Sequence, residues 1–294
     1  MDKQPRFFPE TELILTSEKK VYHINLCNED IADDVIVVGD QGRVAQISRH
    51  FSSVDFKTEH REFVTHTGIY KGKRITVLST GIGPDNIDIV LNELDAAVNI
   101  DPNSRTEKEV KRKLNIIRLG TSGSLQEDIP VNGLVVSEYG LGIDGILTFY
   151  QKWESVTRQD ICDAFVKHTG WAYNLPHPYC VKSDEVLFMK FKTGNFNGIT
   201  TTAPGFYGPQ GRQLRLRAAK PDLNDLLGTF RYNDLRITNF EMETSALYGL
   251  GALLGHNCLT VCVIIANRVK KEFTHNYTQS VDLLIEQCLQ RLTS

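Results

Sequence analysis

Two patterns of apolar residues alternate along this chain of 294 residues. Segments such as 35–38 (VIVV) and 258–266 (CLTVCVIIA) are almost wholly apolar, which is typical of strands buried on both faces of a parallel sheet. Between such segments apolar residues recur every three or four positions, as they do from Ile87 to Val98, which is the spacing of an amphipathic helix. Strands that alternate with helices predict an α/β fold around a largely parallel or mixed sheet.

The same patterns predict elements along most of the chain. Asp85 is a suitable N-cap for the helix that contains Ile87, and Gly255 is suited to end a later helix. A turn of small residues is expected directly after a strand at 115–119, and a long loop is expected at 200–212. The remaining strands are predicted at 35–38, 63–69, 74–79, 133–137, 179–187, 237–240 and 258–266, and the helices at 44–51, 85–98, 158–169, 244–254 and 280–292.

The chain shows no internal repeat and no clear linker, so one domain is expected. Residues 1–20 are interpreted as an N-terminal arm, and residues 21–294 as the domain. Within the domain, residues 101–113 (DPNSRTEKEVKRK) are interpreted as a charged, solvated surface insertion.

Composition narrows the class of protein. A net charge of −3 provides no basic field for nucleic acid, so no nucleic-acid partner is expected. No segment has the length of a membrane span or the apolar core of a signal peptide, which predicts a cytoplasmic protein without a membrane partner. The six cysteines show no zinc-binding spacing, and Cys258 and Cys262 should face the same way as buried thiols of a reducing compartment.

The most informative polar residue is Arg118, which lies inside an apolar strand. A buried guanidinium is costly unless it meets an anion. The residues that follow, 120–123 (GTSG), offer hydroxyls and backbone N–H groups in close order. Together they predict a site for phosphate or another small anion at the carboxyl end of a strand.

Two other strand ends carry polar clusters. Gly39–Arg43 follows the strand at 35–38 and has the form of an anion-binding turn, although an ordinary turn with a solvated arginine explains it equally well. Glu243 follows the strand at 237–240, and either binds sugar hydroxyls or stabilises the dipole of the next helix. The loop at 200–212 is either a connection or the wall of a pocket.

In an open α/β sheet these strand ends should gather at one edge. Three arginines beside glycine-rich turns, Arg43, Arg61 and Arg118, would repel one another without a dianion, and inorganic phosphate is the obvious candidate. The segment from Gly81 to Gly83 is not a dinucleotide fingerprint, because Asn86 occupies the third glycine position.

Six motifs, in order, resemble the nucleoside phosphorylase-I family and are closest to its uridine-cleaving members. The resemblance covers roughly residues 22–292. It implies a single-domain αβα sandwich with a central twisted mixed β-sheet, described as a distorted barrel, in a homo-oligomer whose subunits share sites. The motifs are GDQGRV (39–44), HREF (60–63), STGIG (79–83), RLGTSG (118–123), FYGPQGR (206–212) and FEMETSALYGL (240–250).

The resemblance also assigns roles to individual residues. Arg118, Glu243, Arg212 and Gln210 are implied as catalytic. Arg61 and His23 are expected to come from the neighbouring subunit. Phosphate would be bound by Gly39, Arg43, Arg61, Arg118 and Thr121, ribose by His23, Thr121, Met242 and Glu243, and the base by Ser122, Gly123, Phe206, Gln210 and Arg212.

The implied reaction is the reversible phosphorolysis of uridine to uracil and ribose 1-phosphate, with phosphate as co-substrate and without cofactor or metal. Some hexameric relatives hold a monovalent cation near the position of Glu62, but the STGIG loop is one residue shorter here. Asn267 stands where purine-specific relatives have an aspartate, which disfavours a purine phosphorylase, and a purine or broad-specificity nucleoside phosphorylase is kept as the alternative. A nucleoside hydrolase and a non-catalytic nucleoside-binding protein are further alternatives, whereas dimer or hexamer, and uridine, deoxyuridine or thymidine, stay open.

Overall fold

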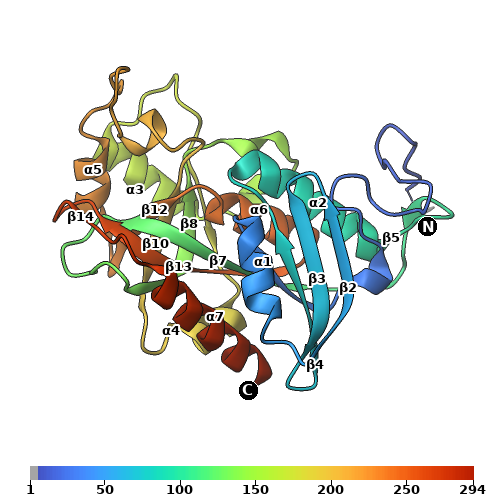
Figure 1. Ribbon diagram of the computed structural model, residues 1–294. Coiled ribbons are helices and arrows are strands. Elements are labelled where there is room, and N and C mark those ends of the chain that lie inside the picture. The colour runs from blue at the N-terminus through green and yellow to red at the C-terminus, as the bar shows by residue number, and fades with distance from the viewer. Residues whose placement is uncertain (1–5) are drawn as a thin grey trace.

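The computed structural model describes residues 6–294 and is built on one mixed sheet of twelve strands (Figure 1). Helices cover it on both sides, which confirms the expected fold class. Residues 1–5, the start of the expected arm, lie outside the described residues. The main strands are β1 (Asp34–Val38), β2 (Ser53–His60), β3 (Phe63–Tyr70), β4 (Lys73–Ser79), β7 (Asn115–Ser124), β8 (Leu134–Gly142), β10 (Phe196–Thr202), β12 (Leu235–Glu241) and β13 (Asn257–Asn267).

Five of these strands close into a barrel. The strands β7, β13, β8, β10 and β12 follow one another in the sheet, and β12 pairs back onto β7 through Asn239–Ser124 and Phe240–Gly123. On the other side of β7, the sheet continues through β1, β4, β3 and β2. The strand β7 therefore belongs to both halves of the sheet, which places Arg118 near the centre of the molecule.

Helices pack on both faces of the open half, and β1 is therefore apolar from Val35 to Val38. In β1, Val35 and Val37 face the cluster that contains α2 and α6, whereas Ile36 and Val38 face the cluster that contains α1, α4 and α7. This arrangement explains why 35–38 is apolar without alternation. The helices are α1 (Gln41–Ser48), α2 (Pro84–Asn99), α3 (Gln159–Thr169), α4 (Glu185–Lys192), α5 (Leu223–Thr229), α6 (Thr244–Leu254) and α7 (Thr278–Thr293).

Several predicted elements end elsewhere. The expected turn at 120–123 is wrong, because β7 continues in parallel register with β13 as far as Ser124. The expected strand at 179–187 stops at Lys182 as β9 (Tyr179–Lys182), and Asp184 then caps α4 by accepting a hydrogen bond of 2.9 Å from Leu187 N. The expected loop at 200–212 begins only after β10, since 200–202 pair with β8 and β12.

Two further differences concern helix and strand signals. The helix α2 starts one residue before Asp85, with Pro84 in its first turn and Gly83 as its N-cap at a φ of 103°, a conformation that favours glycine. The strand β2 was not predicted because its sequence, SVDFKTEH, is mostly polar and half exposed. Strands at the edge of a sheet need no continuous apolar face.

The first part of the segment expected as a charged insertion forms a short hairpin of β5 (Ile100–Asp101) and β6 (Thr106–Glu107). Arg105 at its tip donates hydrogen bonds to backbone carbonyls of the N-terminal arm, among them that of Phe8 at 2.8 Å. The insertion therefore fastens the described part of the arm. The remaining short elements are β11 (Arg231–Tyr232), β14 (Glu272–Phe273), η1 (Asn28–Asp30), η2 (Ile146–Phe149), η3 (Trp153–Val156) and η4 (Gly208–Gln210).

The cysteines agree with the expectation of buried thiols at Cys258 and Cys262. Cys258 and Cys262 are both buried, and all six cysteines are free thiols. Within residues 6–294, the structure contains no helix of the length and apolarity that a bilayer crossing requires.

Candidate active site

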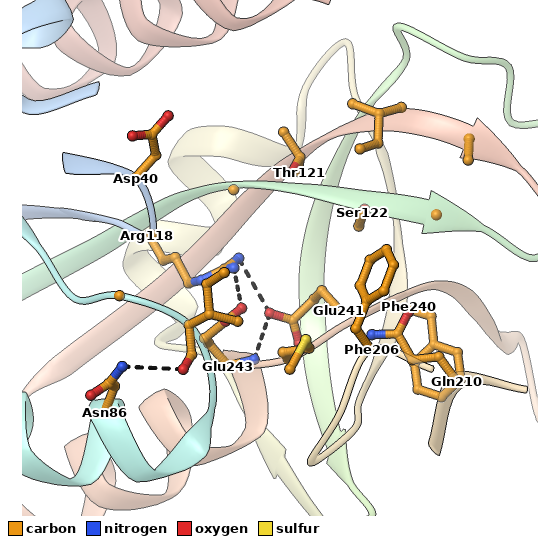
Figure 2. A pocket seen from close by; sticks show the side chains of 18 of the residues that line it. Asp40, Asn86, Arg118, Thr121, Ser122, Phe206, Gln210, Phe240, Glu241 and Glu243 are labelled. Carbon is orange, nitrogen blue, oxygen red and sulfur yellow. Dashed lines mark hydrogen bonds and ion pairs between the residues drawn. The ribbon is translucent and has the colours of Figure 1, made fainter. Parts of the chain in front are cut away.

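A cavity of about 980 Å³ opens at the carboxyl ends of β1, β4, β7, β12 and β13 (Figure 2). The three polar strand ends identified in the sequence converge on it, together with the loop after β10. Of the residues assigned to the site, eleven line this cavity, namely Gly39, Arg43, Arg118, Thr121, Ser122, Gly123, Phe206, Gln210, Arg212, Met242 and Glu243.

Arg118 is buried at the floor of the cavity between two carboxylates (Figure 2). Its guanidinium forms an ion pair with Glu241 at 3.2 Å and a second, closer one with Glu243. Burial alone would lower the pKa of Arg118, but the attraction of Glu243 and then of Glu241 outweighs it and raises that pKa. The anion that a buried Arg118 was expected to meet is thus supplied in part by the protein itself, through Glu241 and Glu243.

Gly120 makes room for this guanidinium. A Cβ atom at position 120 would overlap Arg118 Nη1, so any larger residue would displace the arginine. The glycine that was interpreted as part of a turn is thus a residue of β7 that is small for a steric reason.

Glu241 is held rigidly at the N-terminus of α6. Its carboxylate accepts hydrogen bonds from Glu243 N at 2.9 Å, from Thr244 N at 3.0 Å and from Thr202 Oγ1 at 2.7 Å. These N–H groups have no partner within the helix, and the helix dipole favours a negative charge beside them. The helix-dipole role considered for Glu243 therefore belongs to Glu241, which the sequence analysis gave no role.

Glu243 has fewer bonds and more freedom. Besides Arg118, its carboxylate accepts a hydrogen bond from just one further group of residues 6–294, Gly83 N at 2.9 Å. Burial raises the pKa of Glu243 to about 7, with Arg118 opposing and Glu241 reinforcing the shift. One cation between two buried carboxylates leaves an excess negative charge, which favours a proton on Glu243.

Arg43 forms the opposite wall of this part of the cavity. Asp40 caps α1 by accepting a hydrogen bond from Gly42 N at 2.9 Å, and the helix then carries Arg43 across to Leu119 O, 3.2 Å from its Nη1. Burial lowers the pKa of Arg43, and the nearby Arg118 adds to this effect although Asp40 opposes it. No carboxylate within residues 6–294 forms an ion pair with Arg43, so this cation can receive an anion. We call the part of the cavity formed by Arg43, Arg118 and Glu243 the charged end.

The opposite part of the cavity, here called the amide end, is formed by Phe206, Gln210, Arg212 and Arg268. Arg212 lies 3.6 Å above the ring of Phe206 and donates to Gln210 Oε1 at 2.6 Å. Arg268 donates to Gln210 O at 3.2 Å and to Gln210 Oε1 at 3.4 Å. Burial, and then the proximity of Arg268, lowers the pKa of Arg212 to about 10.

The remaining two expected site residues lie outside this cavity. His23 is held by the carboxylate of Glu93, which lies 2.6 Å from His23 Nδ1 and accepts a hydrogen bond of 2.8 Å from His23 N. Arg61 is exposed, lies over the ring of Tyr22 and donates to its hydroxyl at 3.0 Å. The edge-to-face contact of Tyr22 with His23 joins the two expected residues in one surface cluster.

The sequence profile of the phosphorylase superfamily matches residues 33–294. The chain belongs to this superfamily. It is 32% identical over 272 residues to a uridine phosphorylase from Thermococcus kodakarensis, an alignment that covers 90% of this chain and 84% of that protein. It is also 24% identical to a DeoD-type purine nucleoside phosphorylase from Buchnera aphidicola, over 91% of this chain and 98% of the relative.

Solved structures of phosphorylases have the same fold. A nucleoside phosphorylase from Trypanosoma brucei, whose crystal structure is described as showing uridine phosphorylase activity, superposes with a TM-score of 0.87 at 30% identity. That alignment covers 96% of this chain and 99% of the other. A uridine phosphorylase from Phytophthora capsici superposes with a TM-score of 0.69 at 20% identity, over 98% and 99% of the two chains.

Arg268 lines the cavity, but no role was predicted for it from the sequence. It directly follows the apolar strand β13, and a cation so close to an apolar strand is the signal that could have identified it. Asn267 was treated as a discriminator of base preference, but it does not line the cavity. Its amide donates to Gln126 O and Ile129 O and accepts from the backbone of the following turn, so it holds the end of β13 in place.

Metal binding has no candidate here. Within residues 6–294, no three potential ligands among histidine, cysteine, aspartate and glutamate gather closely enough to hold an ion. Glu62, which the resemblance placed near a cation in some relatives, lines the rim of the cavity.

Proposed function

We propose that this protein is a uridine phosphorylase, which converts uridine and phosphate reversibly to uracil and ribose 1-phosphate. The supporting observation is that one cavity has an arginine-lined charged end and, opposite to it, an amide held between two arginines. The similarity to uridine phosphorylases from two organisms at 30% identity or more supports the same substrate.

Phosphate would occupy the charged end. Arg43 and Arg118 supply the charge, and the backbone of Gly39 and Thr121 supplies further donors. Arg118 would keep its ion pair with Glu241, which the N-terminus of α6 holds in place. Its ion pair with Glu243 would be replaced by one with the phosphate dianion. The released Glu243, together with Met242, would bind the ribose between the two ends of the cavity.

The base would lie at the amide end, against Phe206 and beside Ser122 and Gly123. Phosphate forms a bond to C1′ as the bond from C1′ to N1 breaks, and the leaving uracil acquires negative charge on its carbonyl oxygens. Arg212, Arg268 and Gln210 would stabilise this charge, and such preorganised donors contribute on the order of 3 kcal/mol each. The proton of the phosphate is finally found on uracil N1, so the reaction balances without cofactor or metal.

The test is release of uracil from uridine with and without inorganic phosphate, followed by ultraviolet absorbance. We expect release only with phosphate and formation of an equal amount of ribose 1-phosphate. Phosphate-independent release would identify a hydrolase, and no release from any nucleoside would identify a binding protein. Inosine in the same assay tests the purine alternative, which similarity to purine nucleoside phosphorylases keeps open. Deoxyuridine and thymidine test the sugar and base preference.

The site would be completed by a second copy of the chain, whose His23 and Arg61 reach the ribose and the phosphate. Support comes from their position, since both lie outside the cavity of their own chain in a cluster joined by Tyr22. Arg118→Ala and Arg61→Ala should each be inactive, whereas co-expression should restore activity in mixed oligomers, where one site regains both arginines. No restoration would argue that each chain builds its own site.

Six free thiols suit a reducing compartment, and we place the enzyme in the cytoplasm.

A further inference from the structure

A chain of hydrogen-bonded side chains leads from the cavity wall into the barrel. Ser122 on β7 accepts a hydrogen bond of 2.9 Å from the Nδ2 of Asn239 on β12. The Oδ1 of Asn239 accepts one of 2.8 Å from Thr200 on β10, whose hydroxyl lies 2.5 Å from that of Ser137 on β8. All four residues are at most 5% exposed, and only Ser122 lines the cavity. The four linked side chains thus come from four of the five barrel strands.

The directions of these bonds follow from the chemistry of an amide. The Oδ1 of Asn239 receives a second hydroxyl, that of Thr238 at 2.8 Å, so its acceptor side is fully engaged. Its NH₂ group has no lone pair and can only donate to Ser122. Ser122 Oγ is therefore the acceptor of that bond, and its own proton is free for another partner. No other protein partner of this hydroxyl exists within residues 6–294.

We propose that Asn239 is a positioning residue for base recognition, which directs the hydroxyl proton of Ser122 into the cavity toward a carbonyl oxygen of the base. This inference rests on the proposed function. Figure 2 shows Ser122 on the same side of the cavity as Phe206 and Gln210, where the base would lie. Asn239 touches no substrate and acts only through Ser122.

In the reaction, Ser122 would act as a neutral hydrogen-bond donor to the base, beside the charged donors Arg212 and Arg268. The carbonyl oxygens of uracil become negative as the glycosidic bond breaks, so a fixed donor binds the transition state more strongly than the ground state. Without the amide of Asn239, the Ser122 hydroxyl would rotate freely and lose this preorganisation. A base that presented an amino group to Ser122 could not accept this proton.

Asn239→Leu, Ser122→Ala and the double variant test the inference. Leucine has nearly the shape of asparagine, and the neighbouring hydroxyls keep other partners, since Thr238 also lies 3.1 Å from Ile199 O. We expect both single variants to lower kcat/KM for uridine roughly 10- to 100-fold, with the KM for phosphate within about twofold. The double variant should match Ser122→Ala, because Asn239 has no effect without Ser122.

Thr201→Val is the matched control. Thr201 neighbours Thr200 on the same strand, and its buried hydroxyl has no hydrogen-bond partner among the described residues. This variant should leave the kinetics for both substrates unchanged. If Asn239→Leu does not fold, Thr200→Val removes one of the two hydroxyls that orient the amide, and a loss of roughly threefold or more that disappears in the Ser122→Ala background supports the same conclusion.

Three results would overturn the proposal. An Asn239→Leu variant with wild-type kinetics would show that Ser122 needs no orientation. Losses that multiply in the double variant would show that Asn239 acts independently of Ser122. A parallel rise in the KM for phosphate would point to a general distortion of β12, which also carries Glu241. A wild-type protein inactive on uridine refutes the proposed function instead, and it does so before any variant is made.

Discussion

Arg118 at the charged end and the two arginines of the amide end differ in how their charge is balanced, whereas Arg43 at the charged end has no ion-pair partner within residues 6–294. At the charged end, Arg118 lies between Glu241 and Glu243, and the neighbouring carboxylates raise its pKa. At the amide end, Arg212 and Arg268 converge on the neutral side chain of Gln210. No carboxylate within residues 6–294 forms an ion pair with either of them, and burial lowers the pKa of both.

The difference teaches what each end is prepared to receive. Arg118 already has carboxylate partners, and it can bind a dianion in place of one of them. The charge around Arg118 then changes little, so binding an anion there requires little additional electrostatic free energy. Two unbalanced guanidiniums around one amide instead favour whatever brings negative charge, which is the departing base rather than the neutral nucleoside. One end therefore suits a substrate that arrives charged, and the other a product that becomes charged.

The largest expected effect is that of Arg118→Ala. It should lower kcat/KM for phosphate about a thousandfold. It should also destabilise the protein by about 3–5 kcal/mol, because two buried carboxylates lose their shared partner. Steady-state kinetics and urea unfolding measure the two effects.

Arg49→Ala is the control for stability, because Arg49 forms a largely exposed ion pair with Asp282. Surface pairs of this kind contribute at most about 1 kcal/mol. Equal destabilisation by the two variants would show that the charge balance around Arg118 has no special importance.

Arg268→Ala should act at the amide end alone. We expect a loss of roughly 10- to 100-fold in kcat/KM for uridine, since one of two charged donors to Gln210 disappears. The KM for phosphate should stay within about twofold. A comparable change for both substrates would mean that the two ends are not independent.

Glu243 should make stability depend on pH. Its folded-state pKa of about 7 lies above the usual 4.5, so the folded protein binds this proton more tightly than the unfolded chain. Its contribution to stability is complete below about pH 4.5 and is lost as the pH rises through 7. The loss is about 3 kcal/mol.

The measurement is the free energy of unfolding of the wild type and of Glu243→Gln between pH 4.5 and 8. The stability of the wild type relative to Glu243→Gln should fall as the pH rises and become constant above about pH 8. A relative stability that stayed constant or rose over this range would show that Arg118 keeps Glu243 ionised throughout.

Asn267→Asp should have the smallest effect on catalysis. The aspartate would lose the two hydrogen bonds donated to Gln126 O and Ile129 O, so we expect destabilisation of about 1–3 kcal/mol. Base preference should not change, because Asn267 lies behind the amide end. Thermal unfolding and a comparison of uridine with inosine check both points, and a gain of activity on inosine would contradict them.

Much of the fold could be predicted because its signals are local. The apolar strand at 35–38 and the helical stripe from Ile87 to Val98 require burial wherever they lie, and both are found as expected. The continuation of β7 through residues 120–123 could not be predicted. Gly120 is small because the Arg118 side chain approaches it, which only the three-dimensional structure shows.

The sequence was sufficient to predict which residues form the candidate site, but not which ion pairs and hydrogen bonds they make. Eleven expected residues line one cavity, since strand ends of an α/β sheet meet at one edge. Arg118 pairs with two carboxylates that lie at least 123 positions further along the chain. Nothing in the sequence indicates this pairing. The roles of Glu241 and Asn239 likewise depend on which strand closes the barrel.

The closure of the barrel also bears on folding kinetics. Only two residue pairs join β12 to β7, and the side-chain bond from Asn239 to Ser122 spans 117 positions of sequence. Contacts between such distant residues form after most of the intervening chain has collapsed, because closing so long a loop costs entropy before it gains contacts. The cavity is therefore assembled late in folding, and a ligand that bridges β7 and β12 should slow unfolding more than it speeds folding.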